Sequence, residues 1–492
     1  MDGLAKNFQP LQFFEHNNQK NPPYSLLPSR FIEIEDDRYL LSNEVGEFLI
    51  VDRDQLEAYV HKRLKTSDFL YHDLKSKHFL IDDDSRVALD FLAIKYRTKT
   101  QRLSSFTSLH LFVVTLRCDY NCSYCQVSRQ TQDKTRYDMS LETADRALEH
   151  VFRSPSPTIK IEFQGGEPLL NFPLIRYIVE RSKEINVSQN REIQYVIATN
   201  LSYLEDEVLE FCLKHDIFLS TSLDGQPDLH NRNRPRPDRD GFSLTVQQIQ
   251  KAQNILGKDK VSALMTTTEA SLGRVKEIID VYIELGFKGI FLRPISPYGF
   301  AVKTREAGKY DVEHWLNFYK EGLEYILFIN RSGYRFVEFY TALFLTKLFS
   351  PFGSGYVDLQ SPAGIGISAI VYNYDGDVYA SDESRMLAEM GDKRFRLGNL
   401  HKDSYETMLL SDVLLDTLEQ SLAESCPQCS ECGFLPYCGS DPVYHHATQG
   451  DVIGHKAFSA FCARHMGMLK HLILLLEKNH EVRSLMMKWI RP

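Results

Sequence analysis

Residues 116–125 read Leu-Arg-Cys-Asp-Tyr-Asn-Cys-Ser-Tyr-Cys and directly follow an apolar run that is typical of a buried strand. Three residues separate Cys118 from Cys122, and two separate Cys122 from Cys125. Three thiolates in one short loop can bind three corners of a [4Fe–4S] cubane and leave the fourth iron open for chemistry. A zinc ion completed by a distant residue is the alternative.

The chain that follows this loop alternates between strands and helices. Six apolar runs, most of them followed by an amphipathic stretch, begin near residues 110, 159, 194, 217, 262 and 289. Six βα units in sequence predict an α/β fold in which a parallel sheet curves into a partial (β/α)6 barrel. Functional residues of such barrels lie at the carboxyl ends of the strands, and the cysteine loop follows the first strand.

Bulk composition excludes several function classes. The 492 residues are 43% hydrophobic and 25% charged, as in ordinary globular proteins of about three domains. A net charge of -9 argues against a general nucleic-acid binder. The first residues lack a signal peptide, and no apolar run approaches the ~20 residues that span a bilayer. We therefore expect a soluble, cytoplasmic protein with no membrane partner.

Changes of pattern predict five parts. Residues 1–105 carry short strands followed by a helix, which suits a small α+β module of the winged-helix type. Residues 106–310 form the barrel, and residues 311–350 form a helical bridge rich in aromatic side chains. Residues 351–470 hold a second group of cysteines, and residues 471–492 form a closing helix. The first module either grips a peptide or is a packing extension of the barrel.

A second motif ends the second predicted strand. Residues 164–168 read Gln-Gly-Gly-Glu-Pro. Gly165 and Gly166 let a ligand approach the backbone where a Cβ would otherwise stand, and Glu167 can offer a carboxylate to an ammonium group. The motif alone is also a plausible turn, but its place beside the cysteine loop favours a binding role.

Together, the Cys-x3-Cys-x2-Cys loop, with Tyr124 before its last cysteine, and the Gly-Gly-Glu motif resemble the radical S-adenosylmethionine (SAM) superfamily. The resemblance implies a [4Fe–4S] cluster on the three cysteines, with SAM chelating the open iron. Gly166 and Glu167 would then hold the amino group of SAM, and Tyr124 would lie beside its adenine. An electron from a flavodoxin- or ferredoxin-type donor would cleave SAM, and the resulting 5′-deoxyadenosyl radical would take hydrogen from a substrate.

The same resemblance implies further binding residues at other strand ends. Ser222, at the end of the fourth strand, matches a position that often contacts the ribose or methionine of SAM. Thr199 and Asn200 end the third strand and are further candidates. Arg234 is a candidate for the SAM carboxylate, and a solvated loop arginine is the alternative.

The second cysteine group resembles the SPASM extension of radical SAM enzymes that act on peptides and proteins. Its spacing implies one auxiliary [4Fe–4S] cluster, held by Cys429, Cys432, Cys438 and Cys462. Structural zinc is the alternative, because paired Cys-x2-Cys spacings suit tetrahedral sites. Cys426 has no assigned role.

The other SPASM cluster is expected to be absent. Pro442, Ser361 and Ser381 stand where that cluster's cysteines would be. Asp382 follows Ser381, at the place where sulfatase-maturing members carry a catalytic acid-base. A surface aspartate in a polar loop is the alternative reading of Asp382.

Longer blocks resemble the His-Xaa-Ser system radical SAM maturases. The blocks are residues 112–118, 125–130, 152–157, 161–171 and 437–446. The resemblance implies a ribosomally made precursor peptide, with His-Xaa-Ser repeats, and a companion radical SAM protein as partners. It does not supply the reaction. A sulfatase-type oxidation of Cys or Ser to formylglycine and a non-catalytic, precursor-binding scaffold remain alternatives.

Overall fold

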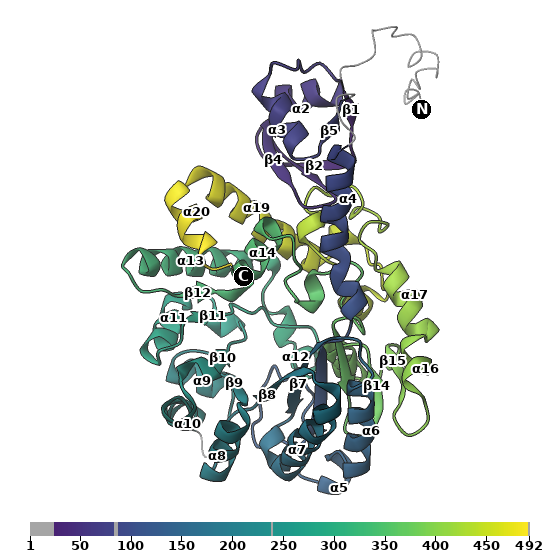
Figure 1. Ribbon diagram of the computed structural model, residues 1–492. Helices are drawn as coiled ribbons and strands as arrows, with labels where there is room; N and C mark the ends of the chain where they lie inside the picture. The colour runs from purple at the N-terminus through teal and green to yellow at the C-terminus, as the bar shows by residue number, and fades with distance from the viewer. Residues whose placement is uncertain (1–23, 83–86, 238–239, 491–492) are drawn as a thin grey trace, which may run out of the picture. The chain divides into compact units, whose positions relative to one another are not determined.

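The computed structural model describes residues 24–82, 87–237 and 240–490 (Figure 1). The chain divides into two compact units, Met1–Arg97 and Thr98–Pro492. The first residues, in which no secretion signal is expected, lie outside the described part. No helix among the described residues is both long and apolar enough to cross a membrane.

The first unit is a small α+β module in which four strands precede the first helix. Its elements are β1 (Ser25–Leu26), β2 (Ser29–Glu35), β3 (Arg38–Asn43), β4 (Phe48–Asp52), α2 (Arg53–Val60), α3 (Phe69–Ser76) and β5 (Leu80–Ile81). Strands β2, β3 and β4 form an antiparallel sheet, and β1 pairs with β5. Asp52 starts α2 by accepting a hydrogen bond from the Gln55 amide. Buried Leu41, Tyr59 and Tyr71 belong to the core of this unit. Helix α4 (Val87–Thr100) contains the boundary between the units.

The second unit is built on one eight-stranded sheet. Its strands are β6 (Leu109–Thr115), β7 (Thr158–Gly165), β8 (Glu192–Ala198), β9 (Phe218–Ser222), β10 (Val261–Leu264), β13 (Ala369–Tyr372), β14 (Asp377–Tyr379) and β15 (Arg396–Asn399). Their order across the sheet is β10-β9-β8-β7-β6-β13-β14-β15. Neighbouring strands from β10 to β13 are parallel, and β14 and β15 are antiparallel. The C-terminal part of the chain therefore shares a sheet with the barrel.

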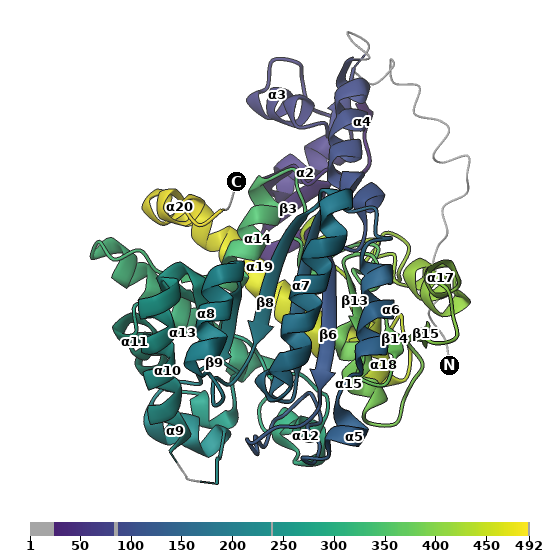
Figure 2. The ribbon, with the colours of Figure 1, turned by 60° about the horizontal axis from the view of Figure 1, so that its bottom comes forward.

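Helices between the strands give the predicted βα alternation. They are α5 (Lys134–Tyr137), α6 (Leu141–Val151), α7 (Phe172–Gln189), α8 (Asp206–His215), α9 (Pro227–Asn233), α10 (Gly241–Leu256) and α11 (Val275–Glu284). Figure 2 shows α6, α7 and α8 next to one another over one face of the sheet. Ser140 caps α6, and its buried face presents Ala144, Leu148 and Val151. Burial of such apolar faces holds the helices on the sheet.

The sixth predicted strand is much shorter than its sequence pattern indicates. Strand β11 (Gly289–Ile290) has two residues and pairs in parallel with β12 (Val337–Glu338) in a separate small sheet. The amide of Thr267, just after β10, still donates to the Arg293 carbonyl at 2.8 Å. Pro294 and Pro297 follow and have no amide hydrogen for a longer ladder.

The remainder of the second unit is mostly helical. Its helices are α12 (Phe300–Lys303), α13 (Val312–Arg331), α14 (Phe339–Phe349), α15 (Asp382–Ala388), α16 (Tyr405–Leu409), α17 (Asp412–Gln420), α18 (Pro442–Gln449), α19 (Ala460–Lys478) and α20 (His480–Met487). The predicted helical bridge corresponds to α13 and α14. The closing helix begins at Ala460, earlier than expected, because the Ser459 side chain caps α19. Cys462 therefore lies in the first turn of that helix.

Candidate functional site

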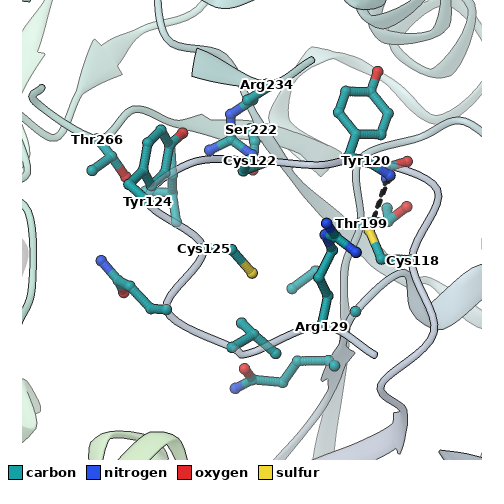
Figure 3. Close-up of a pocket in the computed structure, with 18 of the residues that line it drawn as sticks. Cys118, Tyr120, Cys122, Tyr124, Cys125, Arg129, Thr199, Ser222, Arg234 and Thr266 are labelled. Atoms are coloured by element: carbon teal, nitrogen blue, oxygen red, sulfur yellow. Dashed lines mark hydrogen bonds between the residues drawn. The ribbon is translucent and has the colours of Figure 1, made fainter. Parts of the chain in front are cut away.

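A cavity of about 220 Å³ lies at the carboxyl ends of the parallel strands (Figure 3). The loops after β6, β7, β8, β9 and β10 all contribute to its lining. Predicted site residues in that lining are Cys118, Cys122, Tyr124, Cys125, Gly165, Gly166, Thr199, Asn200, Ser222, Arg234 and Asp382. Residues more than 250 positions apart in the chain thus meet in one space.

The three cysteines of the loop after β6 share this cavity. Figure 3 shows the Cys125 side chain directed into the space that the loop encloses. The Tyr120 amide donates to the Cys118 Sγ at 3.4 Å. Burial raises the pKa of the Cys118 thiol and raises that of Cys122 to about 12. Thiolates at these positions therefore need a bound cation, which a metal cluster supplies.

An ion pair fixes the first turn of this loop. The guanidinium of Arg117 is 3% exposed and donates to both carboxylate oxygens of Asp138, at 2.7 and 2.8 Å. It also donates to the Leu170 carbonyl at 2.8 Å. The far end of the loop is held where the Phe300 amide donates to the Cys125 carbonyl at 2.8 Å. The cysteines are therefore presented by an anchored loop.

Gly165 and Gly166 are required by contact with the backbone of the cysteine loop. A Cβ on Gly165 would stand 1.9 Å from the Thr115 carbonyl oxygen, and one on Gly166 would stand 2.2 Å from that of Arg117. Gly165 also has a φ of +140°, which favours glycine. The amide of Gly166 donates to the Thr115 carbonyl at 2.9 Å. These glycines thus join the ends of β6 and β7 as well as lining the cavity.

Glu167 lies beneath the cavity surface rather than in its lining. Its side chain is fully buried and accepts hydrogen bonds from the Thr199 hydroxyl at 2.6 Å and from the Asn200 amide at 2.7 Å. It also accepts from the Leu169 amide at 2.9 Å. Burial raises the pKa of Glu167 to about 7. In this arrangement Glu167 orients the loop after β8. A contact between its carboxylate and an ammonium group would be additional to these three hydrogen bonds.

Asp224 organises the opposite wall of the cavity. Its fully buried carboxylate accepts from the Tyr124 hydroxyl at 2.6 Å, from the Arg234 Nε at 3.1 Å and from the Thr266 amide at 3.2 Å. The Arg234 guanidinium lies 5.3 Å from the centre of the Tyr124 ring. Arg234 is 13% exposed, so the alternative of a solvated loop arginine is wrong. One carboxylate thus positions both predicted SAM contacts.

Asn200 connects the end of β8 to the cysteine loop. The Asn200 Nδ2 donates to the Asp119 carboxylate at 3.0 Å and lies 3.8 Å from the Cys118 Sγ. Thr199 also lines the cavity and bonds to Glu167. Ser222 lines the cavity at the end of β9.

Asp382 begins α15 and lines the cavity from the C-terminal part of the unit. Its side chain is 20% exposed and accepts from the Nε and Nη2 of Arg385, at 3.3 and 3.1 Å. Arg385 is completely buried and also donates to the Val127 carbonyl at 3.1 Å. A free surface aspartate is therefore the wrong description of Asp382.

The four cysteines predicted to hold an auxiliary cluster form a second group. Cys438 follows a short 3-10 helix, Cys462 lies in α19, and the amide of Cys432 donates to the Cys429 carbonyl at 3.0 Å. Burial, together with the neighbouring thiols of Cys438, Cys429 and Cys432, raises the pKa of Cys462 to about 12. Cys426 is buried and its Sγ donates to the Gln420 carbonyl at 3.2 Å, and its thiol is one of the groups that raise the pKa of Cys429.

The positions where the other SPASM cluster would have cysteines now have structural roles. Ser381 caps α15 in a capping box with Ser384, and Pro442 is the first residue of α18. The Ser361 hydroxyl bonds to Glu424 and accepts from the Ala423 amide at 3.0 Å. The absence of a second auxiliary cluster stays a prediction.

Both cysteine groups have a donor set that fits an iron–sulfur cluster. Within the described residues, no three Cys, His, Asp or Glu side chains converge on a point that a single metal ion would occupy. A cubane makes no such demand, because each thiolate binds a different iron. The first cavity, at about 220 Å³, also exceeds by an order of magnitude the ~10–15 Å³ that one water needs.

Three residues of the site carry no strong signal in the sequence. Asp224 and Arg385 act through partners distant in the chain, and Arg293 lines the cavity. Asp224 alone had a local clue, since it follows Ser222 by two residues after a predicted strand. Arg293 lines the cavity from the segment after β11, which no motif marks.

Residues 112–288 match the model of the Radical SAM superfamily. An uncharacterized protein of Methanocaldococcus jannaschii is 34% identical over 191 residues, which cover 38% of this chain and 63% of that protein. The match thus spans less than two thirds of that relative. The cysteine-type anaerobic sulfatase-maturating enzyme of Clostridium novyi is 22% identical over 373 residues, covering 73% of this chain and 93% of that enzyme.

Two solved structures share the fold. Native anSMEcpe with bound AdoMet has a TM-score of 0.60 and 19% identity, covering 74% of this chain and 97% of that one. SuiB of Streptococcus suis, bound to the precursor peptide SuiA, has a TM-score of 0.53 and 15% identity, covering 89% of this chain and 99% of that one. The predicted α/β fold is confirmed, and residues 112–288 of this chain are similar to the Radical SAM superfamily.

Proposed function

We propose that this protein is a radical SAM enzyme that removes a hydrogen atom from a ribosomally made peptide during its post-translational modification. One observation carries the proposal. The thiols of a Cys-x3-Cys-x2-Cys loop and residues from four further strand ends line a single cavity. An open iron beside such a cavity is the arrangement in which a cofactor can bind and react.

Each residue of the cavity has a proposed role. Cys118, Cys122 and Cys125 hold a [4Fe–4S] cluster, and Gly165 and Gly166 let the cysteine loop approach β7 beside the methionine end of SAM. Bound there, the cluster and SAM would supply the one-electron cleavage that yields a 5′-deoxyadenosyl radical.

The opposite wall would hold the rest of SAM. Tyr124 faces the adenine and Arg234 the carboxylate, and both are fixed by Asp224. Ser222 contacts the ribose or methionine. Glu167 orients Thr199 and Asn200, which complete the wall.

The C-terminal part would complete the reaction. Cys429, Cys432, Cys438 and Cys462 hold one auxiliary [4Fe–4S] cluster. After hydrogen abstraction, Asp382, which lines the cavity, would take a proton from the substrate radical while one electron passes from that radical to the auxiliary cluster. Arg385 donates a hydrogen bond to the Asp382 carboxylate and keeps that carboxylate in position.

A peptide substrate is supported by the similar proteins. SuiB binds a precursor peptide, and the C. novyi relative is a sulfatase-maturating enzyme. We propose a small precursor peptide with His-Xaa-Ser repeats, a companion radical SAM protein and a flavodoxin- or ferredoxin-type donor. The first unit, with its sheet of β2, β3 and β4, is proposed to grip the precursor.

Anaerobic co-expression with a precursor peptide encoded next to the gene for this protein, followed by fragmentation mass spectrometry, tests this function. We expect loss of two hydrogens from a defined residue pair and formation of 5′-deoxyadenosine in the reduced protein. An aldehyde that reacts with hydrazide would instead establish sulfatase-type oxidation. Absence of 5′-deoxyadenosine from protein with a full complement of iron would establish a scaffold and reject the proposal.

A further inference from the structure

A second, smaller cavity lies in the same unit, among the segment after β11 and helices α14, α15, α18 and α19. Its volume is about 40 Å³, room for a few water-sized groups. Three carboxyl groups line it, those of Asp358, Glu383 and Asp441, and we refer to this space as the carboxylate cavity. The guanidinium groups of Arg293 and Arg464 line it as well.

The carboxylate cavity adjoins the positions that lack cluster cysteines. Asp358 lies three residues before Ser361, Glu383 two residues after Ser381, and Asp441 directly before Pro442. Each of these three positions therefore has a carboxyl group of the cavity within three residues of it in the chain. A group other than an iron–sulfur cluster would suit this chemistry.

The charges of the cavity are not balanced. Three carboxyl groups face two guanidinium groups, so one negative charge is left over when all are ionised. Burial raises the pKa of Asp358, Glu383 and Asp441 to about 7 each, and each carboxyl is further affected by another of the three. A bound cation would relieve this repulsion and allow all three to ionise.

Tyr298 supplies an independent sign of a ligand. Its side chain is 1% exposed and lines the carboxylate cavity, and its hydroxyl has no hydrogen-bond partner among the described residues. The charges that act on this hydroxyl are those of Asp441, Glu383 and Asp358. A buried hydroxyl without a partner is costly, and an N–H donor in the cavity would satisfy it.

The carboxylate cavity lies next to the larger cavity that is lined by the cysteine loop. We refer to that larger cavity, where SAM is proposed to bind, as the SAM cavity. Arg293 lines both spaces. Asp382 and Glu383 are the first two residues of α15, and the former lines the SAM cavity while the latter lines the carboxylate cavity. One extended molecule could therefore place a charged end in one space and a reacting carbon in the other.

We propose that the carboxylate cavity is a subsite for a single organic cation, the ammonium or guanidinium group of a substrate side chain. The N–H groups donate to the Tyr298 hydroxyl and to the carboxylates of Glu383 and Asp358, and the positive charge balances the cavity. The small volume admits the head of a lysine or arginine side chain and excludes a whole amino acid. The inference rests on the proposed function in taking the substrate to be a peptide.

The test uses anaerobically reconstituted holoenzyme with SAM bound, and n-butylammonium and n-butylguanidinium as probes. Binding is followed by ligand-observed NMR, with n-butanol and potassium chloride at equal ionic strength as comparisons. The variants are Tyr298→Phe and the double variant Asp358→Asn/Glu383→Gln. Asp416→Asn/Glu419→Gln on the exposed face of α17 is the matched control, since it removes the same charges from residues that line neither cavity.

We expect at least one cation probe to bind, butanol not to bind, and affinity to fall about tenfold or more in the double variant because charged hydrogen bonds are lost. Tyr298→Phe should weaken binding about threefold or more and keeps the test valid if the double variant does not fold. Equal affinity in wild type and Tyr298→Phe, no binding by either probe, or full competition by potassium would overturn the subsite.

A second readout on the same samples separates this inference from the proposed function. SAM cleavage to 5′-deoxyadenosine without binding of either probe would overturn the subsite and leave the function standing. Binding of a cation probe without SAM cleavage would support the subsite and reject the function.

Discussion

At the residue scale, the buried carboxylate of Asp224 controls most of one wall of the SAM cavity. It is fully buried and accepts hydrogen bonds from a tyrosine, an arginine and a backbone amide. Removing one partner of a buried ion pair is costly because the other charge is left uncompensated. The effect of this residue on binding should therefore exceed that of any exposed charge.

Asp224→Asn should raise the Kd for SAM about tenfold or more, because Arg234 loses its counterion and Tyr124 its acceptor. Iron content should stay unchanged. Perturbation of the reduced cluster's EPR signal by added SAM measures the affinity. Asp228→Asn is the control, since its pair with Arg274 is on the surface and Asp228 is 71% exposed. An unchanged Kd for Asp224→Asn would contradict this view of the wall.

The two cysteine groups should lose iron independently. Alanine at Cys118, Cys122 and Cys125 should lower the iron content from about eight to about four atoms per chain. Alanine at Cys429, Cys432 and Cys438 should also leave about four, but here SAM should still perturb the remaining signal. Iron analysis with EPR checks both. Zinc in either group, or about twelve irons in wild type, would contradict the cluster assignment.

At the element scale, two helices start at positions where a second auxiliary cluster was predicted to lack its cysteines, Ser381 and Pro442. Ser381 is 1% exposed, accepts from the Ser384 amide at 3.2 Å and so begins the helix that carries Asp382 and Glu383. Asp441 does the same for α18, accepting from the Tyr444 amide at 2.8 Å. Helix caps thus determine where the carboxyl groups of two cavities lie.

Ser381→Ala should lower the free energy of unfolding by about 1 kcal/mol through loss of the cap. Ser381→Thr keeps a hydroxyl and should lose less. Denaturant unfolding of the reconstituted protein under anaerobic conditions measures both. Equal losses in the two variants would show that packing of the side chain, and not the cap, matters at this position.

The carboxylate cavity should give stability a distinct pH dependence. Glu383 has an ordinary pKa of 4.5 and a folded pKa of about 7, so between these values the folded protein holds a proton that the unfolded chain has released. Stability then falls as pH rises through this window, and the loss is complete above pH 7. Glu383→Gln removes this loss.

In an amine-free buffer, Glu383→Gln should therefore raise Tm relative to wild type by a few degrees at pH 8. At pH 4.5 it should change Tm little, because in the folded wild type the Glu383 side chain is then protonated and uncharged, as glutamine is. Differential scanning fluorimetry across this range checks the slope. Glu419→Gln on α17 should show no such pH dependence. A Glu383→Gln variant that is less stable than wild type at pH 8 would contradict the assigned direction.

What the sequence predicts at these scales depends on how local the determinants are. The loop from Cys118 to Cys125 and the strand ends are local patterns, so both were predictable from residue spacing and alternation. The bond from Tyr124 to Asp224 joins residues 100 positions apart, and that from Val127 to Arg385 joins residues 258 apart. Such partners are fixed by packing of the whole sheet, which no spacing reveals.

The whole molecule consists of two units with separate cores, and this suggests that the two units have different functions. The first unit has its own sheet and buried residues such as Leu41, Tyr59 and Tyr71. All cysteines of both groups belong to the second unit. Chemistry and recognition of the precursor could therefore be separated by deletion.

Deletion of residues 1–86 should leave iron content and SAM cleavage to 5′-deoxyadenosine within about twofold of the full chain, because the proposed cofactor residues are all retained. Modification of the precursor peptide should fall about tenfold or more if the first unit grips it. Chromatography of 5′-deoxyadenosine and mass spectrometry of the peptide give the two rates. Equal loss of both activities would mean that the first unit is a packing extension.

The pairing of β13 with β6 makes the barrel and the C-terminal part inseparable. Strand β6 is buried along most of its length and has β7 on one side and β13 on the other. A protein cut between α14 and β13 would leave the apolar β6 as an exposed edge strand with unpaired amides and carbonyls. Fragments produced one at a time should precipitate, whereas the same fragments made together in one cell should reassemble, because each supplies the neighbour that the other lacks.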